Sequence, residues 1–319
     1  MQRPEPNGAE RYEWNHCFLR PLSSATQVIV DCHTQMWDPE VRVCIEQMAP
    51  AFGTGRVISE AASAMAAGSP VDRAIVLGFK SCYLDAGIPN QHVADYVKRN
   101  GSRMVGFAGI DPRDPECLEE LRSAHEDLHL KGITVSPAMQ DYHPCDTLAL
   151  RVYEDCARRA LPILFQYNTS NPAAKLEYAR PMLLDEVARE FPGLRIVVAH
   201  MGYPWVDETI VLLAKHKHVY AEVSGLLTQP WTAYNALLSA YQYGVIDKLL
   251  FGSDYPFQSP ASCIEALYSV NQLSQGTNLG SIPREQLRGI VERDTLTLLG
   301  IETGRPAREA RKQIIDVEE

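Results

Sequence analysis

Short runs of apolar, often β-branched residues recur along the chain and alternate with longer stretches that carry apolar residues at helical spacing. Continuous apolar runs of this length are typical of strands that are buried on both faces of a parallel sheet. The pattern predicts eight strands, at residues 27–32, 73–78, 104–110, 132–136, 162–166, 195–200, 219–224 and 248–254.

Helices are expected between these strands. Asp114 followed by Pro115, and Ser259 followed by Pro260, are typical of helix starts, because a proline loses nothing where the backbone has no donor to satisfy. The segment 275–319 is expected to hold a terminal helix, "PREQLRGIVERDTLTLLG", and a charged tail.

Eight apolar strands, each followed by a helix, predict an α/β protein of the (β/α)₈ TIM-barrel class. A doubly wound open sheet is the main competitor. The barrel is favoured because no G-x-G-x-x-G follows any strand and because polar residues stand at the ends of many strands, not at one switch point. One barrel domain is expected over residues 26–300, with an N-terminal extension at 1–25 and a C-terminal tail at 301–319.

Composition and charge exclude several classes of partner. Hydrophobic residues make up 45% of the 319 residues, and the net charge of −10 disfavours binding to nucleic acid or anionic lipid. The eight cysteines form no C-x-x-C pair, and no apolar run approaches membrane-spanning length. We therefore expect a cytoplasmic protein with a small-molecule substrate and no nucleic-acid or membrane partner; a homodimer is the default oligomer.

The candidate chemistry stands at the strand ends, where a TIM barrel builds its active site. The first strand leads into Asp31, His33 and Gln35, and the other candidates are Gln166, His200 and Asp254 after the fifth, sixth and eighth strands. Residues at i and i+2 of a strand point the same way, so a metal site here would want a second histidine at position 35, where the chain has glutamine.

Five segments resemble the amidohydrolase-related proteins of the amidohydrolase superfamily, and together they span roughly Val28 to Leu299. They are "IVDCHTQ", "LPILFQ", "FPGLRIVVAHMGYPWVDE", "VYAEVSGL" and "LLFGSDYPF". The resemblance implies a TIM barrel and a hydrolase or decarboxylase acting on small carboxylated rings. It also implies a divalent metal held by histidines on strands one and five and by the aspartate after strand eight.

Carried over by position, His33 and Asp254 match two metal ligands of the resembled family, and His200 matches its strand-six histidine. Gln35 and Gln166 replace family histidines, so two cofactor states stay open. One state holds a divalent ion, with Zn²⁺ expected, bound by His33, His200 and Asp254. The other is metal-free, with Asp254 as the general base and His200 as the group that polarises or protonates the reacting oxygen.

Four further side chains are assigned to the substrate. Gln35 and Gln166 offer a donor and an acceptor on one planar group, which suits a carboxylate or carbonyl. Arg180 is expected to bind a substrate carboxylate, and Trp205 to line the pocket. The predicted function is hydrolysis of a lactone, ester or amide bond in a small carboxylated molecule; the alternatives are a non-oxidative decarboxylase and an inactive relative that binds a small molecule.

Overall fold

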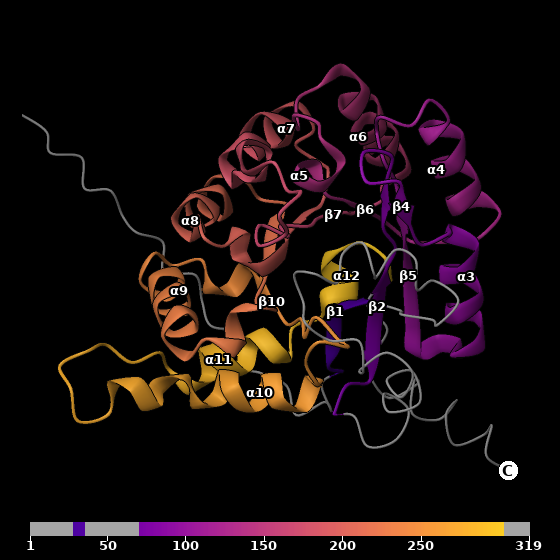
Figure 1. Ribbon diagram of the computed structural model, residues 1–319. Helices are drawn as coiled ribbons and strands as arrows, with labels where there is room; N and C mark the ends of the chain where they lie inside the picture. Colours follow the sequence, from indigo (N-terminus) through magenta and orange to yellow (C-terminus); the bar gives the residue numbers. More distant parts are fainter. Residues whose placement is uncertain (1–27, 36–69, 303–319) are drawn as a thin grey trace, which may run out of the picture. The chain divides into compact units, whose positions relative to one another are not determined.

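The computed structural model describes residues 28–35 and 70–302 (Figure 1). The predicted N-terminal extension and all but the first two residues of the predicted tail lie outside the described residues.

All eight predicted strands are present, and they form a single parallel sheet (Figure 1). The sheet order is β1-β2-β5-β6-β7-β8-β9-β10, so each strand pairs with the next large strand along the chain. The strands are β1 (Val30–Gln35), β2 (Arg73–Leu77), β5 (Met104–Gly109), β6 (Ile133–Val135), β7 (Ile163–Phe165), β8 (Ile196–Val198), β9 (Val219–Glu222) and β10 (Leu249–Leu250).

Hydrogen bonds join the first strand to the segment after the last. The amide of Cys32 donates to the carbonyl of Phe251, and the amide of Asp254 donates to the carbonyl of His33, each over 2.9 Å. Thr34 and Tyr255 form a further parallel bridge. These bonds close the sheet into a barrel, so the TIM-barrel prediction is confirmed and the doubly wound alternative is wrong.

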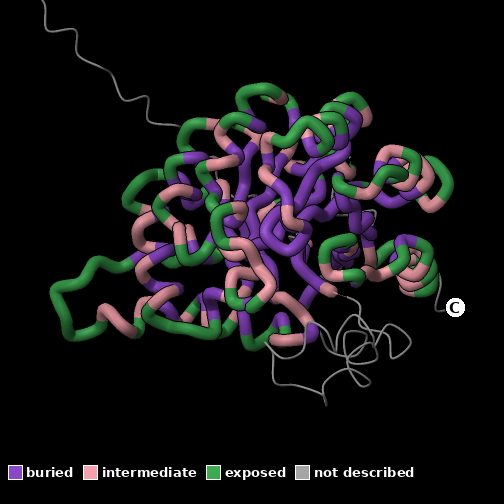
Figure 2. The backbone as a smooth tube through the Cα atoms, turned by 45° about the horizontal axis from the view of Figure 1, so that its top comes forward, coloured by how far each residue is buried: buried purple, intermediate pink, exposed green. Residues whose placement is uncertain are grey.

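Helices surround the strands, and the exposed residues lie on these helices and on the loops that join the elements (Figure 2). The α-helices are α3 (Asn90–Arg99), α4 (Cys117–Glu126), α5 (Pro137–Gln140), α6 (Thr147–Arg159), α7 (Leu184–Glu190), α8 (Val206–Lys215), α9 (Pro230–Gln242), α10 (Pro260–Ser269), α11 (Arg284–Val291) and α12 (Thr295–Leu298). The 3₁₀ helices are η3 (Gly101–Arg103), η4 (Leu176–Ala179), η5 (Pro181–Leu183), η6 (Ala199–Gly202), η7 (Leu226–Thr228), η8 (Ile246–Lys248) and η9 (Val270–Ser274).

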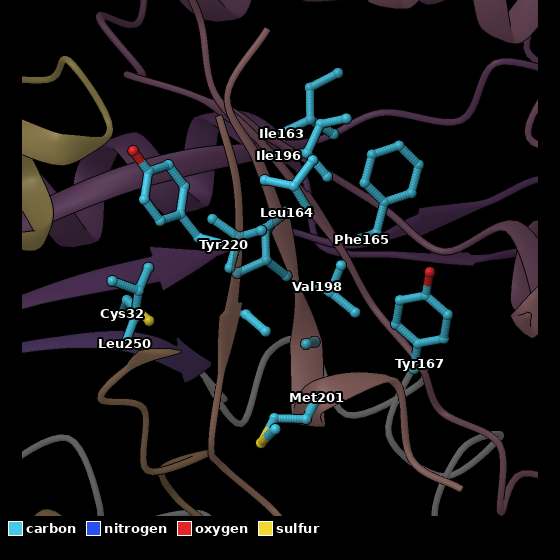
Figure 3. Close-up of a cluster of buried hydrophobic side chains, with 14 of the residues drawn as sticks. Cys32, Ile163, Leu164, Phe165, Tyr167, Ile196, Val198, Met201, Tyr220 and Leu250 are labelled. Atoms are coloured by element: carbon cyan, nitrogen blue, oxygen red, sulfur yellow. The ribbon is translucent and has the colours of Figure 1, made fainter. Parts of the chain in front are cut away.

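The core is apolar on both faces of the strands. Ile163, Leu164 and Phe165 follow one another along β7, and each is at most 1% exposed. Successive residues of a strand point to opposite faces, so one face of β7 fills the barrel and the other packs against helices. Figure 3 shows this cluster with residues from β1, β8, β9 and β10 around it.

Three local expectations need correction. Helix α4 begins at Cys117, not after Asp114, because Asp114 accepts the amide of Glu116 in a turn before the helix. The expected terminal helix is two helices, α11 and α12, since Asp294 accepts the amide of Thr297 and starts a new one. A small antiparallel pair, β3 (Lys80–Ser81) with β4 (Ala86–Gly87), was not predicted.

Helix α10 follows the expectation: Ser259 caps it and Pro260 stands in its first turn. Within the described ranges, no helix is both long enough and apolar enough to cross a membrane.

Candidate active site

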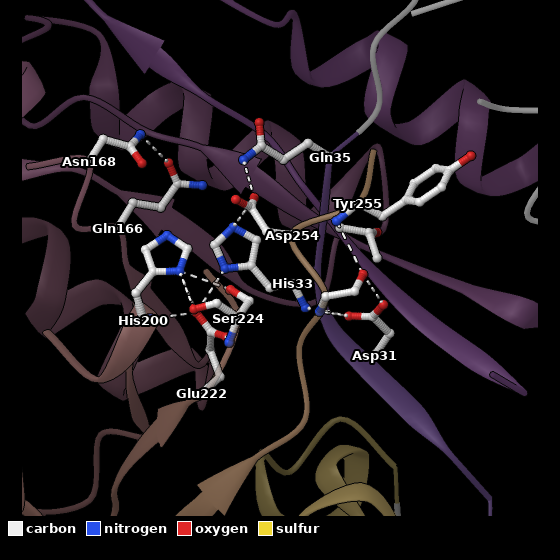
Figure 4. Close-up of polar contacts among 12 residues, drawn as sticks. Asp31, His33, Gln35, Gln166, Asn168, His200, Glu222, Ser224, Asp254 and Tyr255 are labelled. Atoms are coloured by element: carbon white, nitrogen blue, oxygen red, sulfur yellow. Dashed lines mark hydrogen bonds and ion pairs between the residues drawn. The ribbon is translucent and has the colours of Figure 1, made fainter. Parts of the chain in front are cut away.

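Four strands deliver polar side chains to one place at the carboxyl end of the barrel (Figure 4). His33 stands on β1, Glu222 is the last residue of β9, His200 lies in η6 directly after β8, and Asp254 follows β10. The rings of His33 and His200 stack with their centroids 4.9 Å apart. His33 Nε2 lies 3.4 Å from Asp254 Oδ1. The structure therefore brings together the three residues singled out in the sequence.

Glu222 is the centre of the hydrogen bonding in this cluster. Its Oε1 accepts the backbone amide of His200 over 2.6 Å and lies 3.0 Å from His33 Nδ1. Its Oε2 accepts the backbone amide of Ser224 over 2.6 Å. Glu222 is completely buried, so these donors replace the water that would otherwise solvate its charge.

His200 is held in an unusual backbone conformation. His200 and Met201 have φ angles of 53° and 48°, in the left-handed region that residues other than glycine rarely adopt. The turn places the ring so that Nδ1 lies 2.9 Å from the carbonyl oxygen of Ser224. The Ser224 hydroxyl also lies 2.9 Å from Nδ1. Because a carbonyl can only accept, the contact with the Ser224 carbonyl favours the hydrogen on Nδ1, which leaves Nε2 for chemistry.

Two glycines make room for the cluster. A Cβ on Gly252 would lie 2.6 Å from Glu222 Oε2 and 3.0 Å from the Cβ of His33. Gly225 has a φ of +73°, and a Cβ there would lie 3.0 Å from His200 Nδ1. Both positions thus need glycine if the carboxylate and the ring are to sit where they do.

Asp31 fixes the backbone beneath the cluster instead of joining it. It is completely buried, and it accepts the amide of Ser253 over 2.9 Å, the hydroxyl of Ser253 over 2.5 Å and the amide of His33 over 3.2 Å. The contact ties β1, which carries His33, to the segment that carries Asp254.

The predicted substrate-binding amides border the cluster. Gln35 Nε2 donates to Asp254 Oδ1 over 3.1 Å. Gln166 is buried, and its Oε1 accepts a long hydrogen bond of 3.5 Å from Asn168. Figure 4 shows both glutamine amides directed toward the space beside Asp254 and the two histidines.

Arg180 and Trp205 lie together, outside the hydrogen bonds of the cluster. The Arg180 side chain is exposed, its Nε donates to Glu208 Oε1 over 2.8 Å, and its guanidinium lies over the Trp205 ring at 5.3 Å. Because Glu208 already pairs with this cation, a substrate carboxylate would have to compete for it. The roles assigned to Arg180 and Trp205 stay predictions.

A separate hollow of about 430 Å³ opens among the segments that follow β5, β6 and β7. Arg113 and Lys175 line it, and both pair with Asp141 at its wall. No member of the histidine and carboxylate cluster lines this hollow, so it does not enclose the chemistry described above.

The charges of the cluster act on each other strongly. Burial by itself would lower the pKa of His33, but the negative charge of Glu222, its hydrogen bond and Asp254 outweigh burial and raise that pKa to about 9. Burial by itself would raise the pKa of Glu222, yet the charge of His33 keeps it low, at about 2. For Asp254, burial dominates and raises the pKa above its ordinary value.

The residues present fit a divalent metal ion. A tetrahedral site with bonds of 2.0 to 2.2 Å separates neighbouring donors by about 3.4 Å, which matches the spacing of His33 Nε2 and Asp254 Oδ1. His33 Nε2 is a buried nitrogen that makes no hydrogen bond, as a ligand atom would. Its other nitrogen faces a carboxylate, which is the usual arrangement around a metal-bound histidine.

A second position for an ion fits less well. His33, His200 and Glu222 offer ligand atoms within 4.8 Å of one another. The Glu222 oxygens, however, already accept the donors of His33, His200 and Ser224. We therefore assign Glu222 to orienting the histidines, while the binding of an ion by His33, His200 and Asp254 stays a prediction.

The sequence reasoning missed Glu222, Ser224 and the contact between Asp31 and Ser253. Glu222 had a signal, because a charged residue inside the apolar run "VYAEVS" needs polar partners if the strand is buried. Ser224 and Ser253 act through contacts between segments that are distant in sequence, and no local pattern indicates them.

Comparisons with known proteins agree with this fold. The chain resembles an uncharacterized TIM-barrel protein from Bordetella bronchiseptica, with a TM-score of 0.65 and 18% identity over 85% of this chain and 98% of that one. A probable 2-pyrone-4,6-dicarboxylic acid hydrolase from Acinetobacter baumannii gives a TM-score of 0.62 at 14% identity, over 85% of this chain and 99% of that one. A dihydroxybenzoic acid decarboxylase from a Polaromonas species, with bound manganese, gives a TM-score of 0.62 at 15% identity, over 87% of this chain and 98% of that one.

No curated protein matches the chain significantly. The sequence profile of the amidohydrolase family matches residues 30–291, a span that includes every strand of the barrel and all members of the cluster. The chain is therefore a member of the amidohydrolase family.

Proposed function

We propose that the protein hydrolyses a lactone, ester or amide bond in a small carboxylated molecule. The observation that carries the proposal is the position of Asp254, whose carboxylate lies 3.4 Å from His33 Nε2 and accepts a hydrogen bond from Gln35. A carboxylate held in this way at the mouth of a barrel is placed to remove a proton from a water molecule.

Asp254 is suited to act as the general base. Burial raises its pKa, which makes the carboxylate a stronger base than an ordinary surface aspartate. Its side chain is still 18% exposed, so water and substrate have access to it. Gln35 occupies Oδ1, and this contact fixes the carboxylate while a second oxygen can accept the proton.

His200 is suited to act on the reacting oxygen of the substrate. The Ser224 carbonyl lies beside its Nδ1, and its side chain is partly exposed. Nε2 can accept a hydrogen bond when the ring is neutral, or donate a proton to a leaving oxygen when it is charged. Gln35 and Gln166 would orient the carbonyl or carboxylate of the substrate.

A divalent ion would be held by His33, His200 and Asp254. When bound, it would supply Lewis-acid chemistry, polarising a carbonyl and lowering the pKa of a water molecule. The Polaromonas relative contains manganese, which supports a metal in this family of barrels.

The names of the similar solved structures support a carboxylated substrate. The Acinetobacter protein is described as a probable hydrolase of a pyrone dicarboxylic acid, and its structure contains citric acid. A second candidate function, non-oxidative decarboxylation, is supported by the dihydroxybenzoate and carboxyvanillate decarboxylases among the solved structures.

A substrate panel with matched variants tests the proposal. Lactones, aryl esters and hydroxylated aromatic acids are offered to the wild-type protein, to Asp254→Asn and to Asp247→Asn. Asp247 is the exposed aspartate just before β10, at the opposite end of the same strand, and serves as the control. We expect hydrolysis by wild type and Asp247→Asn, and a loss of about 10²- to 10⁴-fold in kcat for Asp254→Asn.

Other outcomes have definite meanings. Release of carbon dioxide without ring or ester opening would establish the decarboxylase instead. No turnover, with several compounds raising the melting temperature, would establish the ligand-binding relative. Elemental analysis of protein purified without chelator should find one divalent ion per chain in wild type and Asp247→Asn and less in Asp254→Asn; a metal-free active enzyme would refute the metal assignment.

A further inference from the structure

We infer that Glu222 is a positioning residue that sets the orientation of both active-site histidines at once. One carboxylate oxygen, Oε1, contacts the ring of His33 and the backbone of His200. The two histidines come from different strands, so a single side chain on a third strand fixes the positions of both. The inference deepens the proposed function, and only its kinetic test rests on that function.

The effect on His33 follows from hydrogen-bond chemistry. An ionised carboxylate can only accept, so His33 Nδ1, at 3.0 Å, must carry a hydrogen. The nitrogen that remains, Nε2, is then the one directed at Asp254. When the ring is neutral, loss of the Glu222 carboxylate would let the hydrogen move to Nε2, and the atom that faces Asp254 would lose its lone pair.

The effect on His200 is through its backbone. Residues with a positive φ persist only where the surroundings hold them. Glu222 accepts the His200 amide over 2.6 Å, and through its other oxygen it accepts the Ser224 amide over 2.6 Å. The Ser224 carbonyl oxygen in turn lies 2.9 Å from His200 Nδ1 and can accept its hydrogen. The carboxylate thus fixes both the turn that carries His200 and the acceptor that orients its ring.

The space for this carboxylate is provided by Gly252. A methyl group there would approach Oε2 to 2.6 Å and push the carboxylate away without changing its charge. Gly252→Ala therefore displaces Glu222 by sterics and also crowds the Cβ of His33 at 3.0 Å, whereas Glu222→Gln keeps the size and replaces one acceptor by a donor. Glu222→Gln tests the carboxylate alone, and Gly252→Ala tests the packing around it.

The first test determines whether Nδ1 of His33 carries a hydrogen, by long-range ¹H–¹⁵N correlation spectra of histidine-labelled, metal-free protein. The His33 signals are assigned with His33→Gln. We expect a hydrogen on Nδ1 in wild type, shifted downfield by the carboxylate, and loss of that downfield shift in Glu222→Gln, whose neutral amide lacks the charge. Glu126→Gln, which changes an exposed glutamate on α4, should keep the wild-type spectrum.

The second test is kinetic. Removing a partner that orients a ligand typically costs about 10- to 100-fold in activity, so we expect kcat of Glu222→Gln and Gly252→Ala to fall by that factor. KM should change little, because Gln35 and Gln166 are untouched. Glu126→Gln should keep both constants.

Each result has a clear consequence. A wild-type spectrum in which His33 carries no hydrogen on Nδ1 overturns the inference, even if neither variant folds. A folded Glu222→Gln with an unchanged His33 signal and unchanged kcat overturns it as well. If the wild-type protein turns over no substrate, the proposed function fails, but the spectra still decide the role of Glu222.

Discussion

Ser253 donates its hydroxyl hydrogen to the Asp31 carboxylate over 2.5 Å, and this contact joins the first strand of the barrel to the segment that follows the last. Both residues are completely buried. Burial raises the pKa of Asp31 to about 7, although the hydroxyl and amide of Ser253 and the amide of His33 oppose that rise. The contact between the first strand and the segment after the last strand thus depends on the hydrogen bonds that Asp31 accepts.

Ser253→Ala should destabilise the fold. The substitution removes the hydroxyl donor to Asp31, so a buried carboxylate keeps only its two backbone donors. The loss should lower the free energy of unfolding by about 1–3 kcal/mol. Urea denaturation of wild type and variant at pH 7.5 measures the difference. Ser281→Ala, an exposed serine, is the control and should unfold at the wild-type midpoint. Equal midpoints for both variants would show that the Asp31 contact adds nothing to stability.

Most of the barrel could be predicted from the sequence, because strands buried on both faces produce continuous apolar runs. The boundaries were less accurate, and this decided which site residues were found. The seventh run was expected to extend over 219–224, so Glu222 looked like an interior residue; the strand ends at Glu222 itself. The first strand, expected at 27–32, covers Val30–Gln35, which puts His33 and Gln35 on the strand and not after it.

The conformation of His200 could not be predicted at all. Its left-handed backbone depends on hydrogen bonds to Glu222 and Ser224, which belong to the next strand and the loop after it. Nothing in "VVAHMG" indicates a positive φ at the histidine, since this conformation is imposed by tertiary contacts. Hydrogen bonds between residues that are distant in sequence can be identified only once the strands are placed side by side.

The stability of the metal-free protein should fall between pH 7 and pH 9. The pKa of His33 is raised from 6.5 to about 9, so the folded state binds this proton more tightly than the unfolded chain does. Its contribution is therefore complete below pH 6.5 and is lost as the pH rises through about 9. The raised pKa of Asp31, about 7, acts in the same direction but at lower pH.

Urea midpoints measured at pH 6, 7, 8 and 9 in the presence of a chelator test this dependence. The decline above pH 7 should be clear in wild type and largely absent in His33→Asn, which lacks the titrating ring. A wild-type midpoint that stays constant from pH 7 to pH 9 would show that His33 is not paired with Glu222 in the way described.

Two glycines with positive φ angles separate strain from function. Gly225 and Gly244 have φ angles of +73° and +78°, so alanine at either position should cost roughly 1–2 kcal/mol of stability. Only at Gly225 would the new Cβ meet a site residue, 3.0 Å from His200 Nδ1; at Gly244 nothing lies within 4 Å. We expect both Gly225→Ala and Gly244→Ala to melt at reduced temperatures, Gly225→Ala at the lower one, while only Gly225→Ala loses turnover, because the His200 ring must shift away from the Ser224 carbonyl. Thermal denaturation and kcat are measured for both variants well below their melting temperatures. Equal loss of turnover in the two variants would mean that general loosening of the fold, and not the placement of His200, limits the reaction.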